Sequence, residues 1–456
     1  MQAAISVKWR RAPFSGISKK TMGGLVSRRL SLRCFPDMLR CMKLRVISLL
    51  GVLLLAHAAV AAERSRDELV ILVGLDGFRW DYLAKLKPPT LSRLAREGVQ
   101  AERMVPSFPT FTFPNLYTLV TGLRPEHHGI IANHMFDPAW RANFALGTAS
   151  VQESRWWEGE PIWVTAQKQG MRTACMFWPG SEAEIGGVRP WQWRLYDGQM
   201  TAEARVQTVL EWLALPPPER PRLITLYFHE ADTAGHRFGP DSAELAAAVE
   251  QVDTALAQLL AGLKRLALED VANLVMVSDH GMVEVSPDRV IVLSELIRSP
   301  AVQVDFAGAI AGLRPPPEMI EETYAALQAK QEHFRVYRRA EIPERLHFRD
   351  HRRIPPLVLV AEEGWTILKR PLLDEAARQN FQRATHGFDP ALPAMGATFL
   401  AWGPAVRHGV TLPPFENVHV YPLLCAILGI TPAANDGDAR LVEQVLVQVP
   451  AAAPPR

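Results

Sequence analysis

The chain has 456 residues, of which 48% are hydrophobic and 21% charged, with 36 Pro, 29 Gly and 4 Cys. This composition is typical of a globular protein and excludes a disordered chain, a collagen-like chain and a small disulfide-stapled domain. Residues 1–61 carry 11 Lys or Arg and one acidic residue, so residues 62–456 carry 39 basic and 47 acidic residues, a net charge of −8. An acidic chain of this kind argues against an extended nucleic-acid surface.

Residues 38–61 have the pattern of a signal peptide. Lys43 and Arg45 precede an apolar run from Val46 to Val60, and the run ends at Ala61 in a small-residue cleavage pattern. The run is short for a transmembrane helix. We therefore expect a periplasmic or secreted protein, with no stable membrane span once the leader is cleaved; an uncleaved anchor is the alternative.

The extreme ends and the cysteines carry less information. Residues 1–37 show no hydrophobic period, and we interpret them as an over-extended start or a disordered segment; residues 451–456 are expected to be a tail. Beyond the leader, only Cys175 and Cys425 remain. Both lie in apolar stretches, so two separately buried thiols are preferred over a single long-range disulfide.

Between these ends, apolar runs typical of buried strands alternate with helical patterns. In chain order they predict a strand at 69–75, a helix at 90–97, a strand at 172–177, a helix at 202–213, a strand at 222–228, a helix at 242–266, and strands at 273–278 and 397–402. This alternation indicates an α/β fold with a mostly parallel sheet covered on both faces. Residues 62–450 are predicted to form one domain, with an inserted, cap-like subdomain at about 290–365.

Acidic and histidine residues cluster just beyond the predicted strands. They are Asp76 after the strand at 69–75, Asp232 and His236 after 222–228, Asp279 and His280 after 273–278, and His386 in a turn-rich stretch before the last strand. Ligands of parallel α/β sheets bind beyond the carboxyl ends of the strands, so these side chains are expected to converge. Each alone has a structural explanation as a turn or cap residue, but their joint placement favours a functional site.

The residue types in this cluster are typical of metal ligands. Mixed Asp and His donors suit zinc or another borderline divalent ion, whereas all-oxygen sites favour magnesium or calcium. Six ligands are too many for one catalytic zinc and divide naturally between two metals. Paired metals about 4 Å apart stabilise the entering and the leaving oxygens of a displacement at phosphorus.

A hydroxyl nucleophile is expected in the segment at 107–115. Thr110 and Thr112 lie in this extended, Pro-rich stretch, before a helix predicted at about 115–121. A hydroxyl beside a helix N-terminus is well placed for a phosphate, and a metal can lower its pKa. Spacing alone does not separate the two threonines, and either could instead be a helix N-cap.

The order of these motifs resembles the nucleotide pyrophosphatase/phosphodiesterase family of the alkaline phosphatase superfamily, over about Leu69 to Val442. The matching stretches include GLDGFRWDYL at 74–83, PTFTFPNLYTLVTGLRPEHHGIIAN at 109–133, DTAGHRFGP at 232–240, SDHGM at 278–282 and THGFDP at 385–390. The resemblance implies an alkaline-phosphatase-like three-layer α/β/α sandwich and a dimetal hydrolase.

The resemblance assigns roles residue by residue. One zinc ion is implied at Asp76, Thr112, Asp279 and His280, and a second at Asp232, His236 and His386. Thr112 matches the family nucleophile that precedes Phe-Pro-Asn, which implies a phosphothreonine intermediate. Asn133 matches an asparagine that hydrogen-bonds a phosphoryl oxygen, an arrangement that stabilises developing charge.

The same resemblance implies a small-molecule nucleotide substrate, cleaved to nucleoside monophosphates. Phe113 and Tyr196 match the aromatic pair that stacks the nucleotide base, although core positions are the alternative for both. His134 stands where animal relatives carry Lys, so contacts to the distal phosphates of a triphosphate are expected to be weaker.

Three other functions stay open. A phospholipid or choline-type phosphodiesterase needs an aromatic cage around a quaternary ammonium group. A phosphate monoesterase with the same metals needs extra Lys or Arg for the second phosphoryl charge. A non-enzymatic binding protein is disfavoured, because every implied ligand is present. The sequence does not specify an oligomeric state.

Overall fold

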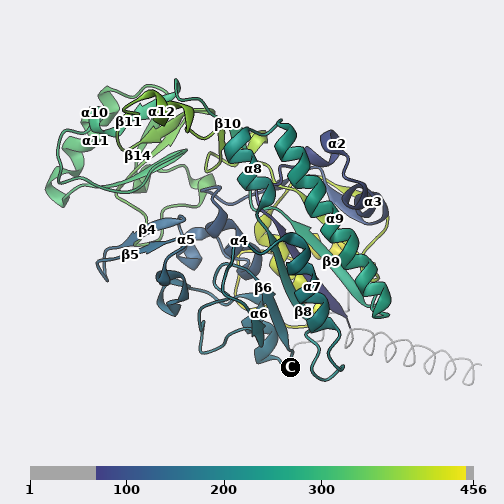
Figure 1. Ribbon diagram of the computed structural model, residues 1–456. Helices are drawn as coiled ribbons and strands as arrows, with labels where there is room; N and C mark the ends of the chain where they lie inside the picture. Colours follow the sequence, from purple (N-terminus) through teal and green to yellow (C-terminus); the bar gives the residue numbers. More distant parts are fainter. Residues whose placement is uncertain (1–67, 448–456) are drawn as a thin grey trace, which may run out of the picture. The chain divides into compact units, whose positions relative to one another are not determined.

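The structure, a computed structural model, describes residues 68–447 (Figure 1). The expected leader at 38–61, the segment 1–37 and the tail at 451–456 lie outside the described residues. Within residues 68–447, no helix combines the length and apolarity needed to cross a membrane.

An eight-stranded sheet forms the centre of the described chain. In spatial order its strands are β19 (Val410–Leu412), β2 (Val99–Ala101), β18 (Phe399–Trp402), β9 (Ala272–Val277), β1 (Leu69–Leu75), β8 (Leu223–Phe228), β6 (Thr173–Met176) and β7 (Gln192–Trp193). From β9 to β7 all neighbours are parallel, whereas β18 runs antiparallel to β9. Every residue of β1, β8 and β9 is buried, which explains their uninterrupted apolar sequences.

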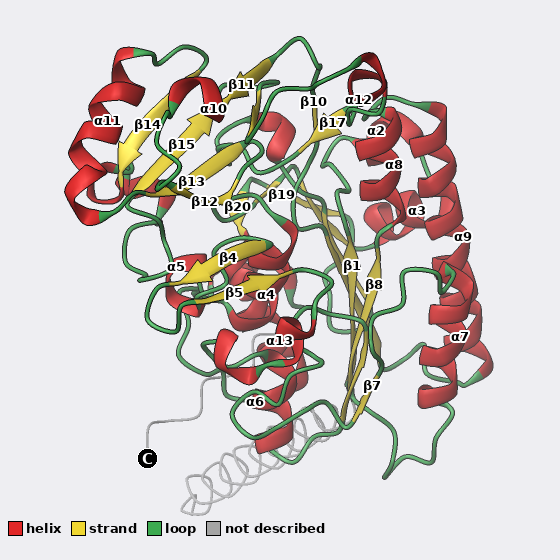
Figure 2. Cartoon of the chain, turned by 60° about the vertical axis from the view of Figure 1, so that its left-hand side comes forward, coloured by secondary structure: helices red, strands yellow, loops and turns green. Residues whose placement is uncertain are grey.

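Helices cover both faces of this sheet, as the edge-on view of Figure 2 shows. One face carries α3 (Pro89–Glu97), α7 (Ala202–Leu213), α8 (Glu230–Phe238) and α9 (Ala243–Arg265); the other carries α4 (Thr112–Thr121), α6 (Ile162–Lys168) and α13 (Val420–Leu428). The predicted α/β class with a mostly parallel sheet is therefore confirmed.

The start of α4 differs from the prediction. The sequence predicts a helix from about residue 115, but α4 begins at Thr112. Pro114 is the third residue of the helix, and the first-turn N–H groups have no intrahelical acceptor, so a proline is tolerated there. The N-cap is Phe111, which makes no side-chain capping bond. The N-cap alternative for Thr110 and Thr112 is therefore wrong.

The described chain also contains a second sheet, which has four antiparallel strands. Its strands, in spatial order, are β12 (Gln303–Phe306), β13 (Ile310–Arg314), β15 (Leu357–Ala361) and β14 (Phe334–Arg338), with α11 (Ile320–Ala329) beside them. It has its own hydrophobic cluster, in which Leu313 and Leu359 pack with Phe388 and Met395. In Figure 2 this sheet stands above the hairpin of β4 (His134–Asp137) and β5 (Ala142–Ala145).

The remaining elements are short and connect these layers. The helices are α2 (Tyr82–Leu86), α5 (Pro125–His128), α10 (Leu293–Leu296), α12 (Glu375–Gln379) and α14 (Arg440–Val445), and the strands are β3 (Met104–Val105), β10 (Val283–Glu284), β11 (Val290–Val292), β16 (Thr366–Leu368), β17 (Ala384–Thr385) and β20 (Phe415–Glu416). Single 3-10 turns occur at Ala149–Gln152, Ser154–Trp156, Pro317–Met319, Arg339–Glu341, Glu344–Leu346, Pro393–Met395 and Asn417–His419.

The two cysteines of the described chain are free thiols. Cys175 lies on β6 and Cys425 on α13, and both are buried. Burial raises the pKa of each thiol to about 12, so neither is a thiolate at neutral pH. The preferred interpretation of two buried thiols is confirmed.

A buried carboxylate joins two helices of one layer. Asp253 of α9 is 2% exposed, and its oxygens accept hydrogen bonds from the backbone N–H groups of Thr90 (2.9 Å) and Leu91 (2.7 Å). These groups lie in the first turn of α3, where no intrahelical acceptor exists. Asp253 therefore caps α3 from a neighbouring helix.

We predict that Asp253→Ala lowers the free energy of unfolding by about 2 kcal/mol, because two buried N–H groups lose a charged acceptor. Chemical denaturation followed by circular dichroism measures the change. Glu250→Ala, at an exposed position of the same helix, is the matched control and is expected to change stability by less than about 0.5 kcal/mol. Equal losses for the two variants would contradict the capping role.

Candidate active site

The carboxyl ends of β1 and β9 bring three ligand candidates together. Asp76 directly follows β1, and Asp279 and His280 come just after β9. The strands pair in register, with Gly74 opposite Val277. All three side chains are buried, with 3%, 0% and 0% of their surface exposed. His280 Nε2 lies 3.4 Å from Asp76 Oδ1 and 3.1 Å from Asp279 Oδ2.

Helix α8 contributes two more metal-ligand candidates. Asp232 and His236 are one helical turn apart, and Asp232 Oδ1 lies 3.3 Å from His236 Nε2. The helix approaches closely because Gly77, next to Asp76, has no side chain: a Cβ there would stand 2.9 Å from Asp232 Cα. Gly77 also has a φ of +65°, which other residues adopt at a cost.

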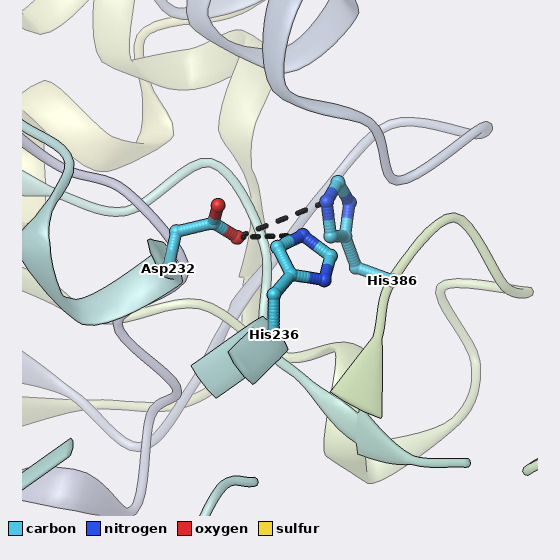
Figure 3. A group of neighbouring side chains, drawn as sticks. All are labelled: Asp232, His236 and His386. Atoms are coloured by element: carbon cyan, nitrogen blue, oxygen red, sulfur yellow. Dashed lines mark ion pairs between the residues drawn. The ribbon is translucent and has the colours of Figure 1, made fainter. Parts of the chain in front are cut away.

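His386 arrives from a distant part of the chain, directly after β17. Its Nε2 lies 3.8 Å from Asp232 Oδ1, and Figure 3 shows one carboxylate oxygen of Asp232 facing the imidazoles of both His236 and His386. The ring of His386 stacks on that of His280, with centroids 3.5 Å apart and planes 9° from parallel. The six candidates predicted from the sequence therefore lie together.

The two candidate threonines have different surroundings. Thr112 is the first residue of α4, and its Oγ1 lies 3.3 Å from His280 Nε2. Thr110 is fully buried, and its hydroxyl donates to Phe388 O (2.9 Å) and accepts from Gly387 N (3.0 Å). The hydroxyl of Thr112 therefore lies among the metal-ligand candidates. The hydroxyl of Thr110 is instead engaged by the backbone of residues 387 and 388.

Backbone carbonyls orient all three imidazoles in the same way. Nδ1 of His280 faces Gly281 O at 2.9 Å, Nδ1 of His236 faces Ala384 O at 2.8 Å, and Nδ1 of His386 faces Thr110 O at 2.9 Å. Each Nδ1–H donates to its carbonyl, which leaves the lone pair of Nε2 free for a ligand. All three lone pairs are directed into the group of carboxylates.

The carboxylates repel one another. Burial and the charges of Asp279 and Asp232 hold the pKa of Asp76 well above its ordinary value. Burial also raises the pKa of Asp232, although neighbouring imidazoles oppose the shift. Burial and the two other imidazoles keep the pKa of His386 well below its usual range, so this ring is neutral and supplies no compensating charge.

These residues fit divalent metal ions. Within residues 68–447, three buried carboxylate oxygens at this place have no hydrogen-bond partner: Asp76 Oδ1, Asp232 Oδ1 and Asp279 Oδ2. Ligand atoms of Asp232, His236 and His386 lie within 4.8 Å of one another, as do those of Asp76, Asp232 and His280. Unpaired carboxylate oxygens beside neutral imidazole nitrogens are the donors that zinc and related ions prefer.

Asn133 has a defined amide orientation beside Thr112. Its Oδ1 accepts a hydrogen bond from the backbone N–H of Phe113 (2.9 Å). In the described part of the chain, no hydrogen bond occupies its Nδ2. The amide therefore presents two N–H donors close to the first turn of α4.

The two aromatic candidates contact different sets of rings. Phe113 packs against Trp157 (6.1 Å between centroids) and is partly buried. Tyr196 is 48% exposed and contacts the ring of Tyr227 at 6.2 Å. Among residues 68–447, no direct ring contact joins Phe113 to Tyr196.

Sequence reasoning missed residues that hold the ligands in place. The hydroxyl of Tyr227, on β8, donates to Asp76 Oδ2. Ser278 Oγ accepts from Phe78 N (3.0 Å) and donates to His280 O (2.8 Å). Tyr227 lies inside an apolar run and therefore resembles a core residue. The available signal was its hydroxyl, which needs a partner when buried.

Comparisons with known proteins agree with this geometry. The sequence profile described as "Type I phosphodiesterase / nucleotide pyrophosphatase" matches residues 70–389. Human ectonucleotide pyrophosphatase/phosphodiesterase family member 1 is 39% identical over 378 residues, covering 80% of this chain and 40% of that protein. Human family member 5 is 36% identical over 378 residues, covering 83% and 78%. The chain thus spans about two fifths of the length of the family member 1 proteins that it matches.

Solved structures give the same result. Human ectonucleotide pyrophosphatase/phosphodiesterase 5 superposes with a TM-score of 0.80 at 35% identity, covering 84% of this chain and 100% of that one. The murine protein, described as inactive through a threonine-to-alanine change and in complex with AMP, gives 0.79 at 36% identity, covering 83% and 100%. The chain therefore belongs to the type I phosphodiesterase/nucleotide pyrophosphatase family and has its alkaline-phosphatase-like α/β fold.

Proposed function

We propose that the protein is an exported dimetal phosphodiesterase/nucleotide pyrophosphatase that releases nucleoside monophosphates. The observation that carries this proposal is the position of Thr112: its hydroxyl begins a helix and lies 3.3 Å from His280, next to unpartnered carboxylate oxygens. Export rests on the leader-like residues 38–61 and agrees with the prefix "ecto" in the relatives' names.

Two zinc ions are the proposed cofactors. Asp76, Thr112, Asp279 and His280 would hold one, and Asp232, His236 and His386 the other. When bound, they supply positive charge that lowers the pKa of the Thr112 hydroxyl and offsets charge on the phosphoryl oxygens.

The chain's own groups then account for two successive displacements. Thr112 Oγ attacks phosphorus, a Thr112 Oγ–phosphorus bond forms, and the bond to the leaving-group oxygen breaks. Water next attacks the phosphothreonine, the Thr112 Oγ–phosphorus bond breaks, and the nucleoside monophosphate leaves. Asn133 Nδ2 is the proposed donor to a non-bridging oxygen, because its Oδ1 is already engaged by Phe113 N. The N-terminus of α4 adds a partial positive charge.

The surroundings of Thr112 favour a diester over a monoester. In the described part of the chain, no Lys or Arg side chain forms an ion pair or hydrogen bond with Thr112 or with the six Asp and His ligands. A monoester brings a second negative charge on the transferred phosphoryl group, and that charge has no fixed cationic partner here. A diester carries one charge fewer.

We expect the kcat/KM for the p-nitrophenyl ester of AMP to exceed that for p-nitrophenyl phosphate by at least about 100-fold, equivalent to about 2.7 kcal/mol. Both substrates release the same chromophore, so one absorbance assay with zinc present compares them. A ratio below one would identify a phosphate monoesterase and contradict the diesterase assignment.

The nucleophile assignment is tested by removing the hydroxyl of Thr112, with a second threonine of α4, Thr118, as the matched control. Thr112→Ala is expected to lose at least about 1,000-fold in kcat, as nucleophile removal does in other covalent mechanisms. Thr118 lies further along the same helix, and its buried hydroxyl is hydrogen-bonded to His128. Thr118→Val removes that hydroxyl and should retain its kcat within about threefold. Metal content measured by mass spectrometry is compared across the variants. Full activity of Thr112→Ala would overturn the phosphothreonine mechanism.

Metal removal should also lower stability. Chelation is expected to reduce the Tm by several degrees, because the carboxylates of Asp76, Asp232 and Asp279 are then uncompensated, and an ion at 100 times its Kd stabilises the folded state by about 2.7 kcal/mol. Scanning calorimetry with EDTA, and again after zinc is restored, measures the shift. The shift should shrink in Asp279→Asn; a Tm insensitive to both EDTA and zinc would contradict the metal proposal.

The aromatic pair of Phe113 and Tyr196, here called the base slot, gives a separate prediction. We propose that a nucleobase stacks on the exposed ring of Tyr196, with Phe113 beyond it. Tyr196→Ala should raise the KM for the p-nitrophenyl ester of AMP about tenfold, since base stacking contributes about 1–3 kcal/mol. Hydrolysis of p-nitrophenyl phenylphosphonate, which has no base, should change little. Trp191→Ala, a half-exposed aromatic position of the same segment, is the control. An equal rise in KM for both substrates would contradict the proposed stacking of the base on Tyr196.

A further inference from the structure

A buried arginine reaches from the second sheet to the segment that carries Asn133. Arg353 lies between β14 and β15 of that sheet, and 0% of its surface is exposed. Its Nε donates to Asp137 Oδ2 (2.9 Å), and its Nη1 donates to Gly129 O (2.7 Å). These two acceptors are the ends of the segment 129–137, and Asn133 is the middle residue of that segment.

The contact at Gly129 depends on a close approach of the backbone. Gly129 has a φ of +75°, and a Cβ there would stand 2.7 Å from Nη1 of Arg353. Glycine adopts this φ without the cost that other residues meet. The same Nη1 donates to Trp156 O (2.8 Å), and the Trp156 ring centroid lies 5.0 Å from the guanidinium carbon. The first end of the segment is therefore held by a fixed guanidinium group.

The contact at Asp137 is a buried ion pair. Asp137 is 0% exposed, and its Oδ1 accepts hydrogen bonds of 2.9 and 3.2 Å from two backbone N–H groups in the turn after β4. Burial opposes its charge, but hydrogen bonds from Arg353 and Arg352 hold the pKa of Asp137 below its ordinary value. A charged, hydrogen-bonded pair of this kind has a defined geometry. The second end of the segment is therefore fixed by the same arginine.

The chain around Arg353 is itself anchored beside the turn that precedes α4. Phe348 packs edge-to-face on Phe108 of that turn, with 5.3 Å between ring centroids. The carboxylate of Glu126, on α5, is buried and accepts hydrogen bonds from the backbone N–H groups of residues 349 and 350 (2.6 and 3.0 Å). Arg353 therefore acts from a rigid support and not from a free loop.

We propose that Arg353 is a positioning residue: it clamps both ends of the segment 129–137 and thereby sets the place of Asn133 Nδ2 relative to the phosphoryl group. The proposal rests on the proposed function, in which Asn133 donates to a non-bridging oxygen. The hydrogen bond from Phe113 N fixes the rotation of the amide. The distance of the amide from phosphorus depends on the backbone between the two clamped ends. A misplacement of about 1 Å can lower a rate about 100-fold.

A double-mutant cycle with the p-nitrophenyl ester of AMP tests whether Arg353 acts through Asn133. Asn133→Ala should lower kcat about 100-fold, as the loss of one donor to a developing charge does. Arg353→Met should lower kcat about tenfold and leave KM within about threefold, because the misplaced donor acts in the transition state. In the Asn133→Ala background, Arg353→Met should lower kcat less than about twofold, since the group that it positions is already absent.

This cycle separates positioning from a general loss of structure. A purely structural effect would lower kcat by the same factor in both backgrounds. Circular dichroism and zinc content give the folded, loaded fraction to which each kcat is normalised. Arg353→Lys is the second variant and covers the case in which Arg353→Met does not fold. It keeps the charge but cannot donate to Asp137 and Gly129 together, so its kcat should also fall and show the same dependence on Asn133.

Arg352→Met is the matched control. Arg352 pairs with the same carboxylate, with 2.9 Å between its Nη2 and Asp137 Oδ2, but its side chain is 39% exposed. Among residues 68–447, no hydrogen bond joins Arg352 to Gly129. It therefore holds one end of the segment only, and its removal should leave kcat within about threefold. Equal losses of kcat for Arg352→Met and Arg353→Met would overturn the clamp.

The outcomes distinguish this inference from the proposed function. An enzyme that does not hydrolyse the ester would overturn the proposed function itself. An enzyme that hydrolyses the ester, but loses the same factor on Arg353→Met with and without Asn133, would overturn the positioning role and leave the proposed function standing. An unchanged kcat in Asn133→Ala, or in both Arg353 variants, would also overturn the positioning role while hydrolysis remains.

Discussion

The mutual repulsion of Asp76, Asp232 and Asp279 is the constraint on which the rest of the site depends. Buried like charges oppose folding, yet the pairing of β1 with β8 and β9 brings the segments that carry these side chains to one edge of the sheet. Gly77 allows α8 to approach, and backbone carbonyls turn three imidazoles toward the same point. The fold thus gathers three buried carboxylates at one place, where burial raises the pKa of Asp76 and of Asp232 although neighbouring imidazoles offset part of the charge.

The sequence predicts the central layers because buried parallel strands are long apolar runs. The predicted strand at 69–75 and helix at 202–213 match β1 and α7 residue for residue. The antiparallel direction of β18 was not predictable, since direction depends on long-range pairing that leaves no local pattern. The start of α4 was placed too late because Pro114 resembles a boundary, although a proline is well tolerated in the first turn.

The candidate site shows the same contrast between features that leave a local sequence pattern and features that do not. The six Asp and His candidates are recognisable because each follows a strand or belongs to a short polar motif, and the structure brings them together. Tyr227 was hidden because its strand is otherwise apolar.

The stacking of His280 on His386 has a consequence for how the protein matures. His386 is separated from the other ligands by the whole second sheet, and β17 delivers it only after that sheet has been passed along the chain. During synthesis, a chain that has emerged only as far as β16 has the partners of His386 but not the ring itself. The Asp232, His236 and His386 set is thus completed by tertiary contacts between distant segments rather than by local sequence. A metal ion at this set would therefore bind after these tertiary contacts have formed, rather than guide the first steps of folding.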